Sequence, residues 1–258
     1  MKIVVLLKPV PDTWGDRKLN LETGLADRAI SETVVDEIGE RSLEVALSYA
    51  DAHADAEVVV VSMAPAESAA TVRKGLAMGA HSAVHVADEG LVGADLGVTA
   101  EVLAAAVRRT GFDLVIAGNV STDGAAGVMG AMLAELLDVP NLTTLTSVVI
   151  GEGTVAGERA SDGANMRVSA DLPAVISVTE ALPDARFPNF KGIMAAKKKP
   201  LETLTLQDLG VEPQESAASQ SIVLRLSEKP PRQAGTKIVD EGDAGQKLAE
   251  FLVQNRLV

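Results

Sequence analysis

Residues 113–137 read DLVIAGNVSTDGAAGVMGAMLAELL, and they decide the fold that the sequence predicts. The run at 113–119 is almost continuously apolar, as is typical of a central parallel strand covered on both faces. A turn of Gly, Ser, Thr and Asp follows it, and the Ala-, Met- and Leu-rich run at 125–138 predicts a helix. A buried strand that turns directly into a helix is one unit of a doubly wound α/β sheet.

The same unit recurs in the first 180 residues. Other Val-rich runs predict parallel strands at 2–7, 57–63 and 173–179. Between the strands, helical patterns lie at 31–52, 67–79 and 96–111. After Pro140, Gly-Glu-Gly and Asp-Gly turns predict an antiparallel ribbon that returns the chain to the sheet edge. The expected fold class is therefore α/β, with a doubly wound, mostly parallel, Rossmann-like sheet.

Regular patterning fades after residue 200, which suggests a boundary near residue 205. We expect residues 1–205 to form the α/β core and residues 206–258 to form a linker, a Pro-rich arm and a C-terminal helix. That helix, within 242–258, is amphipathic, and its apolar face carries Ala244, Leu248, Phe251 and Leu252. A terminal helix joined through such an arm is expected to pack on something other than its own core.

The composition excludes several classes of protein. The 258 residues include 36 acidic and 23 basic side chains, which argues against a nucleic-acid or anionic-membrane surface. The absence of cysteine excludes disulfides, thiolate catalysis and cysteine-ligated metals. The first apolar run, Ile3 to Leu7, is too short for a signal peptide, so we expect a cytoplasmic protein without membrane insertion.

A phosphate site is one interpretation of the glycine-rich turn at 118–130. Small residues at the carboxyl end of a parallel strand let a ligand approach the backbone, and the first turn of the following helix presents N–H groups to an anion. An ordinary strand-to-helix turn is the alternative, because the pattern is neither G-x-G-x-x-G nor a Walker A loop. The ends of two other strands, Lys8 to Asp12 and Met63 to Pro65, are expected to border the same crevice.

Catalytic and metal-binding patterns are not recognisable. His81 and His85 lie on an expected short strand and lack a third ligand, so we expect no metal site. Ser121 and Ser161 have no histidine partner in a known motif. Four acidic residues are expected to form the solvated face of one helix: Asp36, Glu37, Glu40 and Glu44. The sequence therefore indicates a binding protein rather than a hydrolase.

Residues 186–200, RFPNFKGIMAAKKKP, combine apolar side chains with concentrated positive charge. Two of the four phenylalanines and three consecutive lysines lie in this segment. One interpretation is a surface helix that tucks its apolar face under the domain. Pro183, Pro188 and Gly192 favour the other, a protruding loop that docks a protein partner, with apolar residues for affinity and lysines for steering.

Taken together, these segments resemble the beta (small) subunit of electron transfer flavoprotein. The resemblance covers essentially the whole chain and is carried by six fragments in order: VVLLKPVPD, VRKGLAMGAHSAVHV, DLVIAGNVSTDG, GER…LPAVISVTE, FKGIMAAKKKP and PPRQAGTKI. Each fragment alone is weak, whereas their order and spacing are specific.

The resemblance implies an alpha–beta heterodimer that carries electrons without a catalytic constellation of its own. Such a protein accepts electrons from primary dehydrogenases, commonly acyl-CoA dehydrogenases, and passes them to a membrane quinone oxidoreductase. The redox FAD is held mainly by the alpha subunit. The beta subunit buries a structural AMP, which we favour here, or a second FAD in bifurcating members. Residues 228–258 would reach across to the alpha subunit.

The resemblance also implies a set of nucleotide contacts. They begin with Leu6 on the first strand, four residues at a helix start (Asp36, Glu37, Ile38 and Gly39) and Met63 after the second strand. The phosphate would lie on the loop formed by Gly118, Asn119, Val120, Ser121, Thr122, Asp123, Gly124, Ala125, Ala126, Gly127, Val128 and Met129. The chain has Asp36-Glu37 where the family often has Asn-Pro, and Gly127-Val128-Met129 where others carry polar side chains. Phosphate contacts are thus expected to rely on backbone N–H groups.

Residues 186–200 match the recognition loop of the family, which inserts an apolar anchor into the partner dehydrogenase. The matching position holds Phe190, and the other expected contacts are Ile193, Met194, Lys197, Lys198 and Lys199. Two other classes share the superfold. A universal-stress-type nucleotide-binding protein would be shorter and would lack the ribbon and the arm. A nucleotide-dependent ligase or pyrophosphatase would need a phosphate loop and catalytic groups that the sequence lacks.

Overall fold

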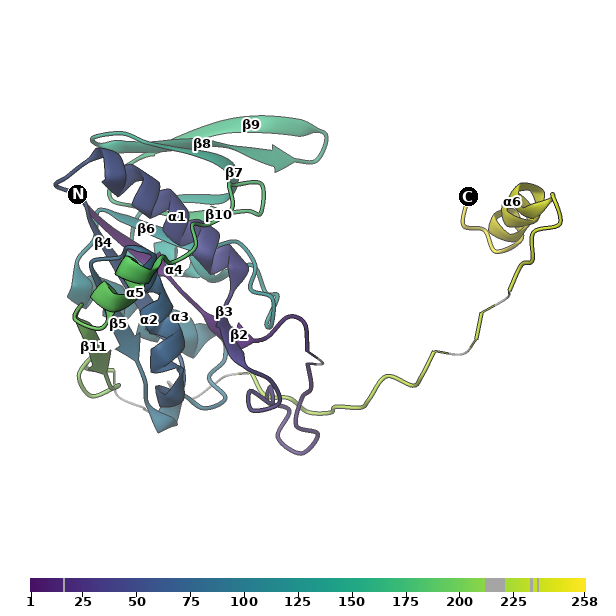
Figure 1. Ribbon diagram of the computed structural model, residues 1–258, viewed down its shortest axis with the longest axis horizontal. Helices are drawn as coiled ribbons and strands as arrows, with labels where there is room; N and C mark the ends of the chain where they lie inside the picture. Colours follow the sequence, from purple (N-terminus) through teal and green to yellow (C-terminus); the bar gives the residue numbers. More distant parts are fainter. Residues whose placement is uncertain (16, 212–220, 233, 236) are drawn as a thin grey trace. The chain divides into compact units, whose positions relative to one another are not determined.

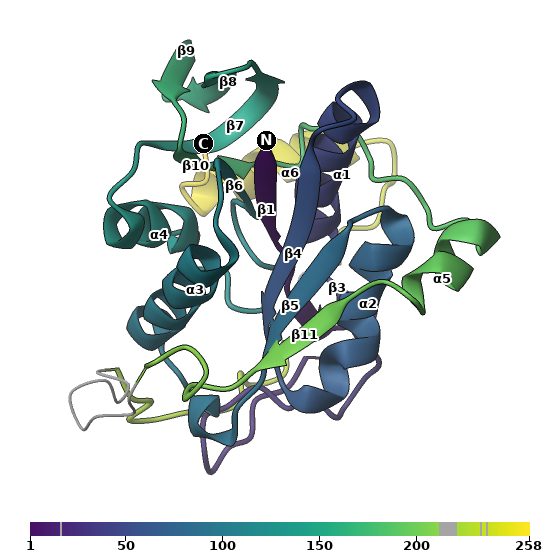
Figure 2. The same ribbon diagram turned by 90° about the vertical axis from the view of Figure 1, so that its left-hand side faces the viewer.

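Figures 1 and 2 show the computed structural model, which describes residues 1–15, 17–211, 221–232, 234–235 and 237–258. The chain divides into two compact units, Met1–Leu224 and Arg225–Val258. In the described part of the first unit, one large sheet has the strand order β11-β5-β4-β1-β6-β10-β7-β8-β9. The predicted fold class is confirmed.

Seven neighbouring strands of this sheet are parallel, from β11 to β7. Their bounds are β11 Leu201–Leu204, β5 Ser82–Val86, β4 Glu57–Met63, β1 Lys2–Leu6, β6 Leu114–Gly118, β10 Ala174–Val178 and β7 Asn141–Ile150. The predicted antiparallel ribbon is present at the edge, where β8 Thr154–Ser161 and β9 Ala164–Asp171 continue from β7. The four strands predicted from Val-rich runs agree with β1, β4, β6 and β10 to within a residue at each end.

Helices cover both faces of the sheet (Figure 2). One face is covered by α1 Glu37–Ala52 and α2 Ala69–Met78, the other by α3 Leu96–Thr110 and α4 Met129–Leu137. Short 3-10 turns precede α2 and α3, at Ala66–Ser68 and Glu89–Leu91. Successive residues of a strand point to opposite faces, so Val5 packs under α1 and α2 and Val4 under α3 and α4. Both layers are aliphatic, which explains how so few aromatics suffice for a core.

The chain reverses its direction of travel across the sheet at β1. From β1 it runs through β4 to β5, and it then crosses to β6 on the other side of β1. The carboxyl ends of β1 and β6 therefore form a topological switch point, the usual ligand position in an open α/β sheet. This edge carries the segments that the sequence predicted to converge.

Two predicted helices begin later than expected. Thr33–Val35 form β3, which pairs antiparallel with β2 Pro9–Pro11, so the helix predicted at 31–52 starts at Glu37. β-branched side chains favour this short ribbon, and Val35 is buried by it. The helix predicted at 125–138 starts at Met129 because Ala125 and Gly127 have φ angles of 51° and 69°, which no α-helix contains.

The segment 186–200 forms a short helix, α5 Phe190–Ala196, so the predicted protruding loop is wrong. Asn189 caps this helix by accepting a hydrogen bond from the backbone N of Gly192. Gly192 fits in a helix here because α5 lies against α2, where a Cβ would overlap the carbonyl oxygen of Ala77. The glycine that suggested a loop is instead required for packing.

The second unit contains one described helix, α6 Ala244–Gln254, inside the predicted range. Leu248 and Phe251 on its expected apolar face are exposed within the chain. The described residues of the arm at 228–237 form neither helix nor strand, and most of the expected linker, 212–220, lies outside the described residues. Across the described ranges, we find no helix with the length and apolarity to cross a bilayer.

Candidate functional site at the switch point

The candidate site is the edge of the sheet where β1, β4 and β6 end. Leu6 is the last residue of β1 and Met63 the last of β4, and both are half-buried at this edge. Gly118 ends β6, and the loop that follows it leads to α4. The start of α1 closes the site from one side. Sequence segments that are more than 80 residues apart thus meet at this edge, where the sequence predicts the crevice.

Gly118 brings the end of β6 close to α1. A Cβ placed on Gly118 would lie 2.5 Å from Cγ2 of Ile38, so a larger residue would push the strand and the helix apart. Gly39 is buried against the end of β1 on the other side of the same turn. Small residues at these two positions let the backbone of the loop approach the start of the helix.

Asp36, the residue before α1, is buried in the crevice with an exposed fraction of 1%. Its Oδ2 accepts a hydrogen bond of 2.9 Å from the backbone N of Thr122, which ties the loop to α1. Its Oδ1 has no hydrogen-bond partner among the described residues. Burial raises the pKa of Asp36, the amide of Thr122 opposes that rise, and the charge of Asp123 adds to it. A buried acceptor is therefore available for a donor group.

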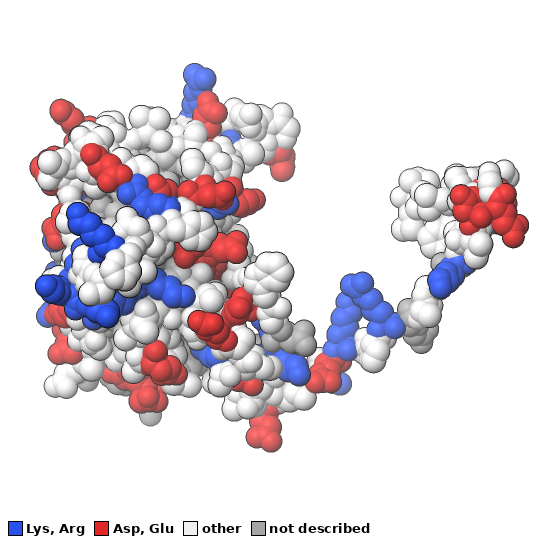
Figure 3. Space-filling view, viewed as in Figure 1, with Lys and Arg blue, Asp and Glu red and all other residues white. Residues whose placement is uncertain are grey.

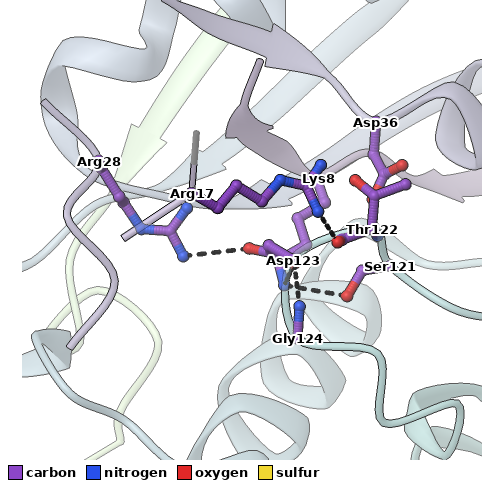
Figure 4. A network of polar contacts seen from close by, with 8 residues as sticks. All are labelled: Lys8, Arg17, Arg28, Asp36, Ser121, Thr122, Asp123 and Gly124. Atoms are coloured by element: carbon purple, nitrogen blue, oxygen red, sulfur yellow. Dashed lines mark hydrogen bonds and ion pairs between the residues drawn. The ribbon is translucent and has the colours of Figure 1, made fainter. Parts of the chain in front are cut away.

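Asp123 lies at the centre of a polar network that joins three segments (Figure 4). Its carboxylate is 2.6 Å from Nζ of Lys8 and 3.4 Å from Nη2 of Arg28. Burial alone would raise the pKa of Asp123, but the hydrogen bond and the charge of Lys8 outweigh burial and hold the pKa below its usual value. Lys8 also donates to Oγ of Ser121 at 3.3 Å. Two cations and a buried anion thus converge beside the loop.

The loop itself presents backbone to solvent. The residues from Gly124 to Val128 are exposed, and the positive φ angles of Ala125 and Gly127 turn this stretch toward the start of α4. Arg17 donates a hydrogen bond to the carbonyl oxygen of Thr122 and so connects the loop to the segment between β2 and β3. Chemically, this edge combines an exposed backbone turn, two side-chain cations that pair with Asp123 and one unsatisfied carboxylate oxygen of Asp36. Backbone turns and cations of this kind suit a phosphate.

The structure places all of the residues expected to contact the nucleotide at this edge. Buried or half-buried there are Leu6, Asp36, Ile38, Gly39, Met63, Gly118, Asn119, Ser121, Asp123 and Met129. Exposed there are Glu37, Val120, Thr122, Gly124, Ala125, Ala126, Gly127 and Val128. The expectation that Asp36, Glu40 and Glu44 lie on a solvated face is wrong. Asp36 is buried before the first turn of α1, Glu40 is half-buried, and Glu44 forms an ion pair with Arg186.

Sequence reasoning missed the cations of this site. It assigned only the backbone of Lys8 to the crevice and gave no role to Arg17 or Arg28. These side chains meet a loop about 100 residues further along the chain. Only the antiparallel pairing of β2 with β3 folds the segment between them toward that loop, and a single sequence carries no local signal for such a contact.

The docking segment, residues 186–200, exposes the apolar side chains that were expected to contact a partner. Phe187 is 95% exposed and Phe190 is 79% exposed, and Ile193 and Met194 are about half exposed. Lys197 and Lys198 are exposed directly after them. Figure 3 shows lysine and arginine side chains gathered over α5 beside an uncharged area. Contiguous exposed aromatic and aliphatic residues of this kind are typical of a protein-binding surface.

Lys199 is placed differently from the two lysines before it. Its Nζ donates to the carbonyl oxygens of Leu76, Gly79 and Ala80, at 3.1, 3.1 and 2.6 Å. Burial lowers the pKa of Lys199. Its side chain is turned into the domain at the end of α2, away from the surface that carries Phe190.

The histidines within β5 and just before it are held by backbone groups, His81 at the surface and His85 in the interior. Nδ1 of His81 accepts from the backbone N of Val58, and the buried Nε2 of His85 pairs with the carbonyl oxygen of Ala64. Burial lowers the pKa of His85. In the parts of the chain that the structure describes, no group of three His, Asp or Glu side chains could hold a metal ion.

Two surface hollows lie at the opposite edge of the sheet, where the strands begin. The larger, of about 570 Å³, is lined in part by Met1, Tyr49 and Glu152, and the smaller, of about 380 Å³, in part by Lys2 and Arg109. Both hollows lie where the strands begin, whereas ligands of open α/β sheets bind at the carboxyl ends of the strands. The switch point is therefore the better candidate.

Comparison with known proteins found similar sequences along the whole chain. A family model described as the electron transfer flavoprotein domain matches residues 27–209. The electron transfer flavoprotein subunit beta of Mycobacterium tuberculosis is 44% identical over 99% of both chains. The chain belongs to the electron transfer flavoprotein family, as a beta subunit. Membership gives it a role in electron transport as part of a flavoprotein, and the resemblance inferred from the six fragments is confirmed.

More distant relatives extend the comparison. The electron transfer flavoprotein subunit beta of Bacillus subtilis is 30% identical, over 98% of this chain and 96% of its own. A subunit of Acetobacterium woodii named caffeyl-CoA reductase-Etf complex subunit CarD is also 30% identical, over 98% of this chain and 97% of its own. The similarity spans both units of the chain, including the arm and α6.

Proposed function

We propose that the chain is the beta subunit of a heterodimeric electron transfer flavoprotein. With an alpha subunit, it shuttles electrons from primary dehydrogenases, such as acyl-CoA dehydrogenases, to a membrane quinone oxidoreductase. It acts in the cytoplasm as a carrier without a catalytic constellation of its own. Membership of the beta-subunit family along the full chain supports this proposal.

In this proposal the crevice binds a structural AMP, and the redox FAD is held mainly by the alpha subunit. The unsatisfied Oδ1 of buried Asp36 is the observation that carries the nucleotide site. An unpaired buried acceptor is costly, and an amino or hydroxyl donor of adenosine would satisfy it. Lys8 and Arg28, which pair with Asp123, supply positive charge for a phosphate that lies on the amides of the loop. The residues present therefore fit the group.

The docking segment supplies the surface for the dehydrogenase. Phe190 is the main anchor, with Ile193 and Met194 beside it and Lys197 and Lys198 steering an acidic partner. Residues 206–258, with α6 at their end, pack on the alpha subunit. The exposed Leu248 and Phe251 of α6 support this assignment, because an amphipathic helix stabilises a fold only when its apolar face is covered.

Co-purification tests the nucleotide site directly. The chain is produced alone and together with a candidate alpha subunit, flavin absorbance is recorded, and the nucleotides released by denaturation are separated and counted. We expect one FAD and one AMP per heterodimer. A second FAD in place of AMP would instead assign the chain to the bifurcating members.

A charge variant locates the phosphate. Lys8→Gln removes one of the two cations at Asp123 and is expected to lower AMP occupancy at least severalfold, since a charge-assisted hydrogen bond contributes about 1.5–3 kcal/mol. Lys2→Gln is the matched control, because Lys2 begins the same strand and pairs with Glu57 at its opposite end. Equal AMP content in both variants would exclude the crevice as the phosphate site.

A stable monomer that hydrolyses ATP unaided would favour the universal-stress class.

A further inference from the structure

Two cations join α5 to α2, and they do so in opposite directions. Arg73, on α2, donates through Nη1 to the carbonyl oxygen of Ala196 at 2.8 Å and to that of Lys199 at 3.4 Å. Lys199, which follows α5, donates to three carbonyl oxygens around the end of α2. α2 therefore provides a cation for carbonyl groups at and after the end of α5, and the segment after α5 provides one for carbonyl groups at and after the end of α2.

Two of these carbonyl groups, those of Leu76 and Ala196, belong to the last turns of the helices, and those of Gly79 and Ala80 directly follow α2. The last four C=O groups of a helix have no intrahelical partner, and the helix dipole makes them attractive to cations. Leu76 lies in the last turn of α2, and Ala196 is the last residue of α5. Neither helix has a basic residue of its own in its last turn. Arg73 and Lys199 therefore do what basic residues in the last turns of α5 and α2 would otherwise do.

α5 and α2 pack in close contact. Gly192 lies against the carbonyl oxygen of Ala77, and Ala196 is buried in the core beneath α1 and α2. Figures 1 and 2 both show α5 beside α2. By contrast, Phe187 and Phe190 contact little of the protein's own surface. The packing of Phe187 and Phe190 therefore does not set the orientation of α5.

A second set of ion pairs holds the chain before α5. Arg186 pairs with Glu44 at 2.8 Å and with Asp51 at 2.8 Å, both on α1. Arg41, also on α1, pairs with Asp184 and donates to the carbonyl oxygen of Leu182. The docking segment is thus held at its beginning by α1 and at its end by α2, and the exposed apolar side chains lie between these points.

We propose that Lys199 and Arg73 are positioning residues, which hold α5 and its exposed apolar face in one orientation by exchanging C-terminal caps with α2. This inference rests on the docking role of α5 proposed above. It assigns Lys199 a different task from Lys197 and Lys198, which remain the steering charges. A pre-oriented face loses less conformational freedom on binding and so binds more tightly.

The test compares Lys199→Met with Lys198→Met in the full heterodimer. Both variants remove one charge and keep an apolar stem, but only the first removes the three hydrogen bonds to α2. We expect amide hydrogen exchange in residues 190–196 to become about tenfold faster in Lys199→Met and to stay unchanged in Lys198→Met. In reduction by the dehydrogenase, Lys199→Met should raise KM about fivefold at every salt concentration without changing kcat.

The dependence of the reduction rate on salt concentration distinguishes a positioning residue from a steering charge. The effect of Lys198→Met on the rate should fade as ionic strength rises, because exposed charges are screened, whereas the effect of Lys199→Met should persist. Arg73→Met is the second variant, which removes the opposite cap and should speed exchange in the same residues.

Three results would overturn the proposal: unchanged exchange in both Lys199→Met and Arg73→Met, faster exchange without a rise in KM, or an effect of Lys199→Met that salt abolishes. If no dehydrogenase reduces the wild-type heterodimer, the docking role fails, and hydrogen exchange alone decides whether the two residues hold α5.

Discussion

The crevice at the switch point and the docking segment leave opposite kinds of groups without a partner. In the crevice, polar groups are gathered and mostly paired with one another, and the group left over is a buried carboxylate oxygen of Asp36. In the docking segment, the backbone is capped and held, and the groups left over are the large apolar side chains of Phe187 and Phe190. In both regions, side chains from neighbouring segments hold the backbone in place: Lys8 and Arg28 at the crevice, and Arg73 and Arg186 at the docking segment.

The difference follows from the size of the expected ligand. A nucleotide is small, so its site must enclose it and supply each donor or acceptor at a set place. A protein partner brings its own surface, so its site needs exposed apolar area on a firm support. If this distinction is correct, substitutions in the crevice should alter nucleotide content and leave docking unchanged. Substitutions in the docking segment should alter docking and leave nucleotide content unchanged.

The largest expected effect is on docking. Phe190→Ala removes the exposed anchor and should lower kcat/KM for reduction by the dehydrogenase about 100-fold, since truncating a central aromatic typically costs 2 kcal/mol or more. The heterodimer and its nucleotide and flavin content should stay intact. Stopped-flow reduction and released-nucleotide analysis measure the two properties on one sample.

Met166→Ala is the control for Phe190→Ala, because Met166 is an exposed apolar residue on β9, outside the docking segment. It should leave reduction unchanged. Loss of flavin or AMP from Phe190→Ala would break the comparison, because the segment would then be structural.

The next effect is expected in the crevice. In Gly118→Ala, the new methyl group would meet the side chain of Ile38 at 2.5 Å, and pushing β6 from α1 should lower the free energy of unfolding by about 1–3 kcal/mol. AMP retention should fall with it, whereas docking by assembled heterodimers should be unchanged. Urea unfolding and nucleotide analysis test this result.

Gly153→Ala provides the matched control, since no atom lies within 4 Å of a Cβ at that position and its φ is not in the left-handed region. Equal stability of the two alanine variants would show that the close approach of β6 to α1 is not required.

The smallest expected effect concerns the charge of Asp36. Its pKa is raised in the folded chain, first by burial, so the stability linked to this group is present below its unfolded pKa of 3.8 and is lost as pH rises through the folded pKa. Asp36→Asn keeps an acceptor for Thr122 and removes the charge. We expect it to raise the free energy of unfolding of the nucleotide-free chain by about 1 kcal/mol at pH 7.

That gain should shrink as pH falls toward 3.8, and unfolding followed at several pH values measures it. Saturating AMP should also abolish the gain, because the nucleotide would then satisfy Oδ1 in the wild type. A loss of stability in Asp36→Asn would mean that the charge serves the N-terminus of α1.

The sheet and the place of the site could be predicted because they depend on short-range patterns. Continuous Val-rich runs fix the central strands, and parallel strands bring their carboxyl ends to one edge. The resemblance assigned candidate contacts to both regions. Composition alone also indicated that segment 186–200 was unusual.

What could not be predicted depends on contacts between distant segments. In the sequence, Asp36 fits the solvated face of the helix expected at 31–52. In the structure, β3 takes the place of the first turns of that helix, and Asp36 is buried before α1. Gly192 looks like a helix breaker until the carbonyl oxygen of Ala77 is seen beside it. Lys199 shares its sequence context with Lys197 and Lys198, and only the end of α2 distinguishes it. Local pattern cannot separate such residues from their neighbours.

The ion pairs and caps on either side of α5 have a consequence for how such carriers could change partners. The residues that orient the segment, Arg41, Arg73, Arg186 and Lys199, all point back into the domain. Among the residues that face outward, Phe187 and Phe190 have few contacts with the rest of the fold, and Ile193 and Met194 are about half exposed. Substitution of the outward-facing residues would therefore change which partner protein binds, while the residues that orient α5 stay the same. This makes the segment a suitable place for evolution or engineering to change the electron donor.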